Sequence, residues 1–206
     1  MLYLSKKEFI TMKFVLATSN EHKKEEFESY FKKYNIEILT LKDLNINVDV
    51  EETGSTFKEN AYIKASTIAK LTPHVVIADD SGLQIHALND FPGIYSARFM
   101  EGHTYEEKFV SINEKLQNIS DRSACFNCTL CIMNLEKNPI YIEGKAEGTI
   151  LESSKGKQGF GYDPIFYYEP LKKTFAELTK DEKNQVSHRG LAIKKFIEYL
   201  KECNYL

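Results

Sequence analysis

Short apolar runs alternate along this chain with segments of helical periodicity. The runs at 13–18 (KFVLAT) and 75–78 (VVIA) are too short for helices, and they are typical of strands buried on both faces of a parallel sheet. Between them, Phe27, Tyr30, Phe31 and Tyr34 lie at i, i+3, i+4 and i+7, which predicts a helix packed on that sheet. The pattern therefore predicts an α/β fold.

The later segments extend this pattern. Helices are expected after Thr56, after Thr104 and near the C-terminus. Strands are expected at 124–133, 140–144, 145–151 and 165–168, and they suggest antiparallel strands added to a parallel core, hence a mixed sheet. With no internal repeat and no linker, residues 13–206 are expected to form one domain or two tightly joined lobes, after an extension at 1–12.

Composition and charge narrow the class of protein. The 206 residues are 42% hydrophobic and 28% charged, which is ordinary for a globular chain. The formal net charge of -3 argues against a nucleic-acid partner but not against a local basic pocket. No apolar run is long enough to span a bilayer, so no membrane partner is expected. The opening segment does not have the pattern of a signal peptide, and the first arginine is Arg98, so a cytoplasmic location is expected.

Three cysteines form a C-x2-C-x2-C pattern that could indicate a metal site. Cys125, Cys128 and Cys131 lie, however, in a segment that alternates like a strand. Cys128 would then point to the opposite face from the other two, which would be roughly 20 Å apart at about 3.3 Å per residue. We therefore expect small buried hydrophobic side chains rather than metal ligands.

Two adjacent carboxylates follow the run at 75–78. Asp79 and Asp80, with Ser81 and Gly82 behind them, are predicted to lie at the carboxyl end of that strand, where α/β proteins bind ligands. Neighbouring carboxylates are costly unless a cation or a proton neutralises them, and they suit Mg²⁺ beside a substrate phosphate. The alternative is a simple turn, with Gly82 supplying backbone freedom.

Several other segments carry candidate binding groups. The segment Ser19 to Lys23 lies between a strand and a helix N-terminus, which favours an anion such as phosphate, although Asn20 could be only a helix cap. Glu51 or Glu52 could bring a further carboxylate to the metal, and Lys64 could face the same site. The glycine-rich segment 155–163 presents Phe160 and Tyr162 as possible partners for a base.

Seven motifs in order give the chain a resemblance to a known family. They are ATSNEHK, EETGSTFKENAYIKA, ADDSGLQIHAL, FPGIYSARF, GFGYDPIF, TFAEL and EKNQVSHRG, and they span residues 17–190. The chain resembles the Ham1/RdgB family of inosine triphosphate pyrophosphatases. The resemblance implies an α/β fold with a long central mixed sheet flanked by helices, two lobes with the active-site cleft between them, and a homodimer. It also implies conversion of ITP, dITP or XTP to the monophosphate and pyrophosphate, with one or more Mg²⁺ ions that Mn²⁺ could replace.

The resemblance also implies residue roles. Asp80, or its neighbour Asp79, would accept the proton of the attacking water, and Asp80 with Glu52 or Glu51 would hold the metal. Lys64 would bind the triphosphate together with Thr18, Ser19, Asn20 and Lys23. Residues that would bind the nucleotide elsewhere are Ser81, Phe160, Gly161, Tyr162, Asp163, Lys183, His188 and Arg189. Arg189 can only donate hydrogen bonds, which suits a 6-oxo purine and opposes a 6-amino one.

Three other functions compete with this one. A haloacid-dehalogenase-like phosphatase would need its two aspartates two positions apart, whereas Asp79 and Asp80 are adjacent. A nucleotide sensor would bind without turnover, and a nucleic-acid-binding module would need a basic stripe. The sequence leaves open the order of preference among ITP, dITP and XTP, the number of metal ions and the dimer geometry.

Overall fold

The computed structural model describes residues 12–206, so the predicted N-terminal extension lies outside the described residues except for Met12. Its centre is an eight-stranded mixed sheet with the order β2-β1-β3-β5-β6-β7-β8, and β4 pairs beside β3. The strands are β1 (Met12–Leu16), β2 (Ile36–Thr40), β3 (Val75–Ile85), β4 (Phe91–Pro92), β5 (Ser123–Met133), β6 (Ile140–Ile150), β7 (Phe166–Tyr168) and β8 (Lys173–Thr174). The β1–β2 and β1–β3 pairs are parallel and the others antiparallel, as the sequence predicted.

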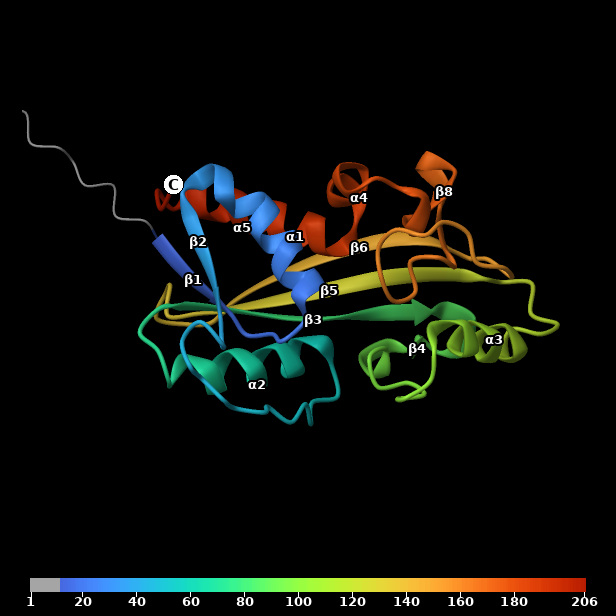
Figure 1. Cartoon of the computed structure of the whole chain (residues 1–206), viewed down its shortest axis with the longest axis horizontal. Helices are drawn as coiled ribbons and strands as arrows, with labels where there is room; N and C mark the ends of the chain where they lie inside the picture. Colours follow the sequence, from blue (N-terminus) through green and yellow to red (C-terminus); the bar gives the residue numbers. More distant parts are fainter. Residues whose placement is uncertain (1–11) are drawn as a thin grey trace, which may run out of the picture.

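Helices cover both faces of this sheet. Figure 1 shows α1 and α5 on one face, and α2 and α3 on the other. The helices are α1 (Glu21–Phe31), α2 (Phe57–Ala69), α3 (Tyr105–Lys115), α4 (Lys180–Val186) and α5 (His188–Glu202), with short 3-10 turns η1 (Lys32–Tyr34), η2 (His86–Leu88), η3 (Gly93–Tyr95), η4 (Glu169–Leu171) and η5 (Phe175–Glu177). No helix within residues 12–206 is long and apolar enough to cross a membrane.

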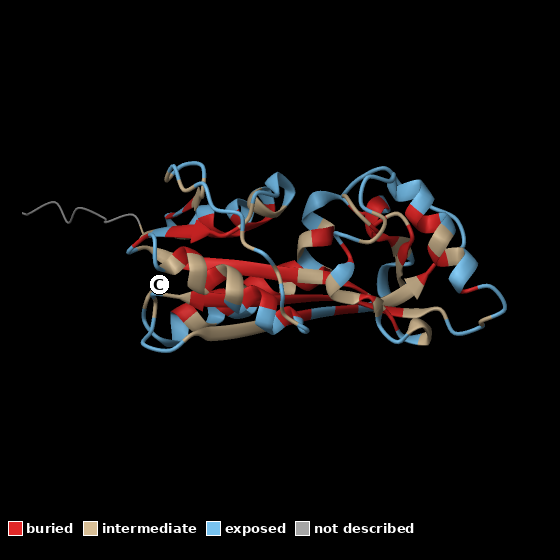
Figure 2. Cartoon of the chain, turned by 90° about the horizontal axis from the view of Figure 1, so that it is seen from below, coloured by how far each residue is buried: buried red, intermediate tan, exposed pale blue. Residues whose placement is uncertain are grey.

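The apolar core is divided along the length of the sheet. At one end, Phe14, Phe31 and Phe196 pack together beneath α1 and α5. At the other end, a separate cluster gathers around Phe126 and Phe166, with α3 packed against it. Figure 2 shows the buried strands running through both ends, with exposed residues on the outer helices and loops. The long strands β3, β5 and β6 therefore join two lobes that each have their own core.

The cysteine prediction is confirmed. Cys125, Cys128 and Cys131 all lie in β5, and all three thiols are free and buried. Cys128 belongs to the core under α5, whereas Cys131 packs on the opposite face under α2. Their side chains alternate across the strand, so they do not meet on a metal.

Two strand predictions are wrong. The segments 140–144 and 145–151 are one continuous strand, β6, because Gly144 is not a break but a point of close packing. A Cβ atom at Gly144 would lie 2.1 Å from the carbonyl oxygen of His188 in α5.

The second error concerns the acidic pair. Asp79 and Asp80 do not lie at the end of a strand, because β3 continues through them to Ile85. The long partner β5 pairs with β3 from Val76 to Ile85 and keeps it extended. Only the other neighbour, β1, ends near the pair, so the aspartates lie beyond the carboxyl end of β1 rather than of β3.

Candidate active site

The acidic pair lies where one edge of β3 has no strand partner. On this edge β1 pairs with β3 only as far as Ile77, and β4 pairs with it from Gln84. Between these points, residues 78–83 pair with no strand of the described chain on this edge. The exposed backbone groups take side-chain partners instead: Ser96 Oγ accepts the Leu83 N–H at 2.9 Å. This gap in the sheet leaves room for side chains from both faces to approach the same backbone atoms.

Two lysines meet at this gap from opposite faces of the sheet. Lys23 in α1 and Lys64 in α2 both donate to the main-chain carbonyl oxygen of Asp79, at 3.3 and 2.8 Å respectively. Lys64 also binds Asp80 Oδ1 at 2.8 Å. Lys23, Lys64 and Asp80 therefore share one site, and two ammonium groups are available there for an anion.

Asp79 is neutralised by cations on its own face of the sheet. Its Oδ1 binds Lys23 Nζ at 2.5 Å and its Oδ2 binds Arg189 Nε at 2.7 Å. Ser81 Oγ and the Cys128 thiol donate to the same carboxylate. Burial alone would raise the pKa of Asp79, but Arg189 and Lys23 outweigh it and hold this pKa well below its usual value. A carboxylate with such a pKa and four donors is a poor proton acceptor.

Asp80 has a different environment. Its Oδ2 is buried without a hydrogen-bond partner in the described chain, and burial raises the pKa of Asp80, assisted by the nearby Glu52 carboxylate and opposed by Lys64. Glu52 reaches the other side of the same ammonium group, with Oε1 2.6 Å from Lys64 Nζ. Of the two aspartates, Asp80 is therefore the one with a carboxylate oxygen that has no hydrogen-bond partner in the described chain.

Glu52 rather than Glu51 faces the site. Glu51 is exposed, whereas Glu52 lies between Lys64 and Arg98, whose Nη1 donates to the Glu52 carbonyl oxygen at 3.1 Å. Burial would raise the pKa of Glu52, but Lys64 and Arg98 lower it overall. The loop is fixed by Asn60, which accepts the Gly54 N–H at 2.8 Å, and a Cβ atom at Gly54 would lie only 2.7 Å from the same oxygen.

The segment before α1 forms the predicted turn. Asn20 caps the helix by accepting the N–H groups of His22 and Lys23, and Thr18 Oγ1 accepts the Asn20 N–H. Thr18 and Ser19 line a hollow of about 520 Å³ between this turn and the loop after β2. Asn20 lines this hollow as well, and together with Lys23 it also lines a neighbouring small cavity of about 120 Å³. The cap prediction is correct, and the polar turn also reaches the site.

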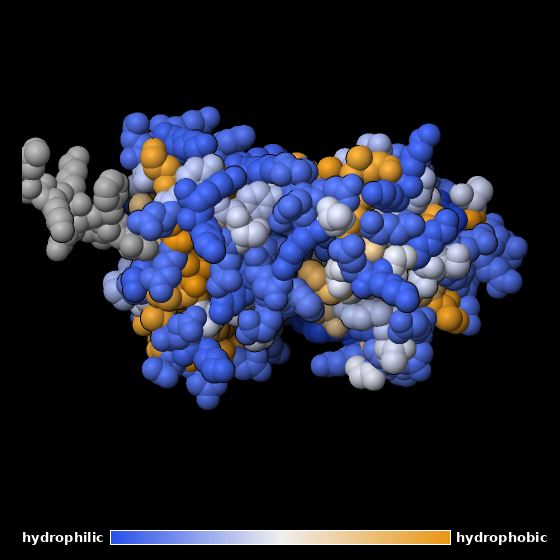
Figure 3. Space-filling view, turned by 45° about the horizontal axis from the view of Figure 1, so that its top comes forward, coloured by the Kyte–Doolittle hydropathy of each residue, from blue (hydrophilic) through white to orange (hydrophobic). Residues whose placement is uncertain are grey.

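That small cavity contains the remaining predicted nucleotide-binding residues. It is bordered from the far lobe by the glycine-rich loop and from the C-terminal segment by α4 and α5. Its lining includes Ser81, Phe160, Gly161, Tyr162, Asp163, Lys183, His188 and Arg189. Figure 3 shows a mostly hydrophilic surface with a notch between the two ends of the molecule. All the residues singled out from the sequence except Glu51 therefore lie in or beside one cleft.

A chain of buried ion pairs runs along this cavity. Arg189 joins Asp79 to Glu26, with Nη1 2.6 Å from Glu26 Oε2, and its Nη2 donates to Ser81 Oγ. Glu26 also lies 3.6 Å from Lys183, which binds Asp163 Oδ2 at 2.5 Å. The network extends from Lys23 at the sheet gap to the glycine-rich loop, so the two ends of the cleft are held in a fixed relation.

His188 and the glycine-rich loop complete the cavity. His188 stacks on Phe126 with ring centroids 4.6 Å apart, and burial lowers its pKa well below the usual value, aided by Arg189 and Lys183. The ring is therefore neutral. The loop turns at Gly159 and Gly161, both with positive φ, and Phe160 N–H donates to Asp163 Oδ2 at 2.8 Å. Tyr162 is anchored by its hydroxyl to the Ser96 carbonyl oxygen.

The carboxylates at the sheet gap are the groups that could hold a metal ion. No group of three His, Cys, Asp or Glu side chains in residues 12–206 is arranged to bind one. Two carboxylates do converge, those of Glu52 and Asp80, and the unpaired buried Oδ2 of Asp80 is available as a ligand. This set fits Mg²⁺, which is commonly held by one or two carboxylates while phosphate oxygens and water complete its shell.

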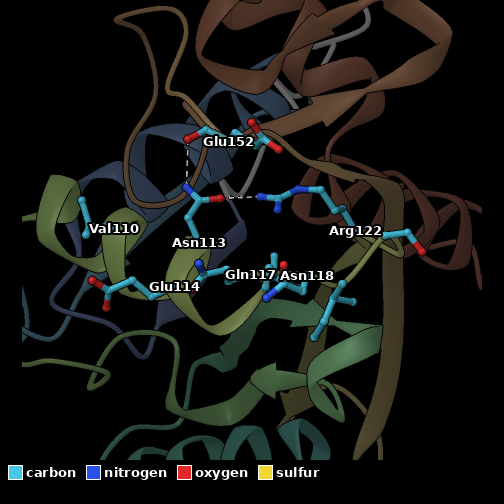
Figure 4. Close-up of a pocket in the computed structure, with 10 residues that line it drawn as sticks. Val110, Asn113, Glu114, Gln117, Asn118, Arg122 and Glu152 are labelled. Atoms are coloured by element: carbon cyan, nitrogen blue, oxygen red, sulfur yellow. Dashed lines mark hydrogen bonds between the residues drawn. The ribbon is translucent and has the colours of Figure 1, made fainter.

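A larger hollow of about 800 Å³ lies elsewhere, beside the C-terminal end of α3 (Figure 4). Its one arginine, Arg122, is already bound through Nε to the Ile150 carbonyl oxygen and through Nη2 to Asn113. Asn113 in turn donates to the Glu152 carbonyl oxygen at 2.9 Å. These groups hold the end of β6 against α3, so we place the active site in the cleft and not in this hollow.

Two residues of the site, Glu26 and Arg98, were not predicted from the sequence to have a role there. Glu26 had one signal, because it lies three residues after Lys23 and so on the same side of the helix. Arg98 lies in the motif FPGIYSARF, but its contact with Glu52 depends on how the segment after β4 folds back.

Comparison with known proteins identifies the class to which this fold and cleft belong. The chain belongs to the Ham1 family, whose model matches residues 14–199. It is 45% identical over 192 residues to a dITP/XTP pyrophosphatase of Thermoanaerobacter pseudethanolicus, covering 92% of this chain and 96% of that protein. A protein of the same name from Clostridium perfringens is 44% identical over 198 residues, with coverage of 92% and 97%.

Solved structures agree. A HAM1 protein from Coxiella burnetii superposes with a TM-score of 0.85 at 41% identity, covering 93% of this chain and 99% of the other. The Ham1 protein of Staphylococcus aureus gives a TM-score of 0.84 at 40% identity, covering 92% and 98%. The predicted family and the predicted mixed α/β fold are both confirmed.

Proposed function

We propose that this protein hydrolyses the non-canonical purine nucleotides ITP, dITP and XTP to the monophosphate and pyrophosphate, and so removes them from the nucleotide pool. The observation that carries the proposal is the gap in β3, where Lys23 and Lys64 meet Asp80 beside a small cavity. The names of the relatives, dITP/XTP pyrophosphatases, support the same substrate class.

The two lysines would bind the triphosphate, and Asp80 would act on water. An ammonium group is a strong point charge for phosphate oxygens. As the water oxygen forms a bond to phosphorus, its proton passes to the Asp80 carboxylate, and the bond to the departing pyrophosphate breaks. Asp80 suits this role because its raised pKa makes it the better proton acceptor of the pair. Asp79 would instead hold Lys23 and Arg189 in place.

Glu52 and Asp80 would hold Mg²⁺, or Mn²⁺ in its place. When bound, the ion would supply positive charge that offsets charge on the phosphate oxygens. Arg98 and Lys64 would keep the Glu52 carboxylate ionised and in place for that purpose, because both lower its pKa. Asp79 and Asp80 would not act together as the two aspartates of a phosphatase, since the Asp79 side chain lies on the other face of the sheet.

The cavity would select the purine. Phe160 would stack on the base, while Lys183, His188 and Arg189 would face its edge. The remaining N–H groups of Arg189 can only donate, so they suit a 6-oxo group and oppose a 6-amino group. A site built to hydrogen-bond one substituent can reject its replacement by as much as ~10⁴–10⁵. We therefore expect strong preference for ITP and XTP over ATP.

The homodimer and the cytoplasmic location implied by the resemblance stay predictions. Sedimentation of the full chain at micromolar concentration tests the first, and fractionation of cells tests the second. Two copies per particle and recovery with cytoplasmic markers are the expected results.

The test of the proposed function is a product analysis. Incubation with ITP and Mg²⁺ should release pyrophosphate and IMP, with ATP turned over far more slowly. Orthophosphate as the first product would indicate a phosphatase, and binding without turnover would indicate a nucleotide sensor. Lys64→Ala should lose most of the activity, whereas Lys13→Ala is a matched control because the ion pair that Lys13 forms within the described residues is with the exposed Glu37.

A further inference from the structure

An aromatic contact joins the start of α1 to the glycine-rich loop. The imidazole of His22 stacks on the Phe160 ring, with centroids 4.9 Å apart and planes inclined by only 7°. His22 belongs to the turn that also presents Asn20 and Lys23, whereas Phe160 belongs to the far lobe. The stack therefore connects the predicted phosphate-binding turn with the predicted base-binding loop.

The cavity and the histidine contact Phe160 differently. Phe160, Lys183 and Arg189 all line the cavity, and the Lys183 ammonium and Arg189 guanidinium lie 4.7 and 5.8 Å from the Phe160 centroid. His22 is exposed and is not part of the cavity lining. His22 therefore contacts the ring from outside the cavity, whereas the two cations lie close to the ring where it lines the cavity.

Among residues 12–206, the aromatic and cationic side chains that contact the Phe160 ring are those of His22, Lys183 and Arg189. The loop is folded around Asp163, which accepts the Phe160 N–H, but that bond fixes the backbone and not the ring. The two flanking glycines have positive φ and no side chains with which to pack. A parallel aromatic stack contributes beyond the area that it buries, so the imidazole can hold the ring in one orientation.

We propose that His22 is a positioning residue that holds Phe160 flat for stacking on the purine. The proposal rests on the proposed function in one respect, which is that Phe160 stacks on a purine. The role requires a flat ring, because the contact of His22 with Phe160 is a parallel stack of the two rings.

Kinetics on ITP and ATP test this role. His22→Ala should raise KM about two- to tenfold, the range that one aromatic pair provides, with kcat little changed. The rise should be the same for ITP and ATP, because every purine has the same kind of stacking face. His22→Phe should restore the parent KM. His86→Ala is the matched control and should change nothing, because within residues 12–206 the ion pairs of His86 are with Asp90 and Glu147, away from the cavity.

A second measurement needs no turnover. In the ligand-free protein, NMR relaxation of the Phe160 ring should show greater ring mobility in His22→Ala than in the parent, and the mobility of the parent in His22→Phe. Greater ring mobility without any nucleotide turnover would leave this positioning role standing while the proposed function failed. The proposal is overturned if His22→Ala leaves the ring mobility unaltered, or if it lowers KM, which would mean that the imidazole competes with the base.

Discussion

Asp79 and Asp80 are neighbours in β3, yet their carboxylates lie on opposite faces of the sheet and have opposite electrostatic environments. Asp79 points toward α1 and α5, where Lys23 and Arg189 neutralise it. Asp80 points toward α2, where Lys64 binds one oxygen and the other has no partner. One carboxylate therefore contributes to the architecture of the cleft, and the other is available for chemistry.

This contrast predicts opposite effects on stability. Asp79→Asn removes the shared partner of two buried cations, so the free energy of unfolding at pH 7 should fall by about 3–5 kcal/mol. Asp80→Asn should change it by less than about 1 kcal/mol, because an ionised Asp80 is itself disfavoured by burial. Urea unfolding of both variants gives the comparison. Equal losses would show that the two environments do not differ in this way.

Stability should also depend on pH through His188. The pKa of His188 in the folded state lies well below 6.5. As the pH falls below 6.5, the imidazole therefore stays neutral in the folded protein but takes up a proton in the unfolded chain. The free energy of unfolding should therefore be highest above about pH 6.5 and should fall as the pH drops below it, by up to about 1.4 kcal/mol per pH unit. In His188→Gln the profile between pH 7.5 and 5.5 should be flatter. Parallel stability profiles of the parent and His188→Gln would show that His188 is not the source of this pH dependence.

Arg98 should affect the metal requirement. Arg98→Ala removes one of the two cations that lower the pKa of Glu52 and frees the loop that carries it. The Mg²⁺ concentration for half-maximal activity should rise several-fold, a modest change because the guanidinium is partly exposed. KM for ITP at saturating Mg²⁺ should stay within about twofold of the parent value. A change in KM with no change in metal dependence would assign Arg98 to the substrate instead.

Glu26 should control base selection. Glu26→Gln removes the carboxylate that binds Arg189 Nη1, so the guanidinium keeps only its bonds to Asp79 and Ser81 and should be oriented less firmly toward the cavity. The ratio of kcat/KM for ITP to that for ATP should fall at least tenfold, by an increase in KM for ITP. Glu25→Gln is the matched control, since the ion pair of Glu25 in the part of the chain that the structure describes is with the exposed Lys180. An unchanged ratio would mean that Arg189 does not read the base.

Much of this fold was predictable from the sequence because its signals are local. The stripe of Phe27, Tyr30 and Phe31 and the buried runs in β1 and β3 are periodic, and α1, β1 and the start of β3 lie where they were expected. The alternation around Cys128 likewise predicted β5 and the separation of the thiols.

The errors arose where a distant partner decides the local structure. β3 continues past Asp80 because β5 pairs with it, and β6 continues through Gly144 because α5 packs closely there. Neither partner can be recognised within a short window of sequence. The choice between Glu51 and Glu52, the roles of Glu26 and Arg98, and the contact of His22 with Phe160 depend in the same way on the tertiary fold.

The most direct test of the central claim is turnover of ITP with Mg²⁺ by Asp80→Asn, measured as pyrophosphate release beside the parent protein. We expect this variant to unfold like the parent but to lose about 10²–10⁴-fold in kcat, since it lacks the proton acceptor. An Asp80→Asn protein that releases pyrophosphate at the parent rate would contradict the role of Asp80 as that acceptor.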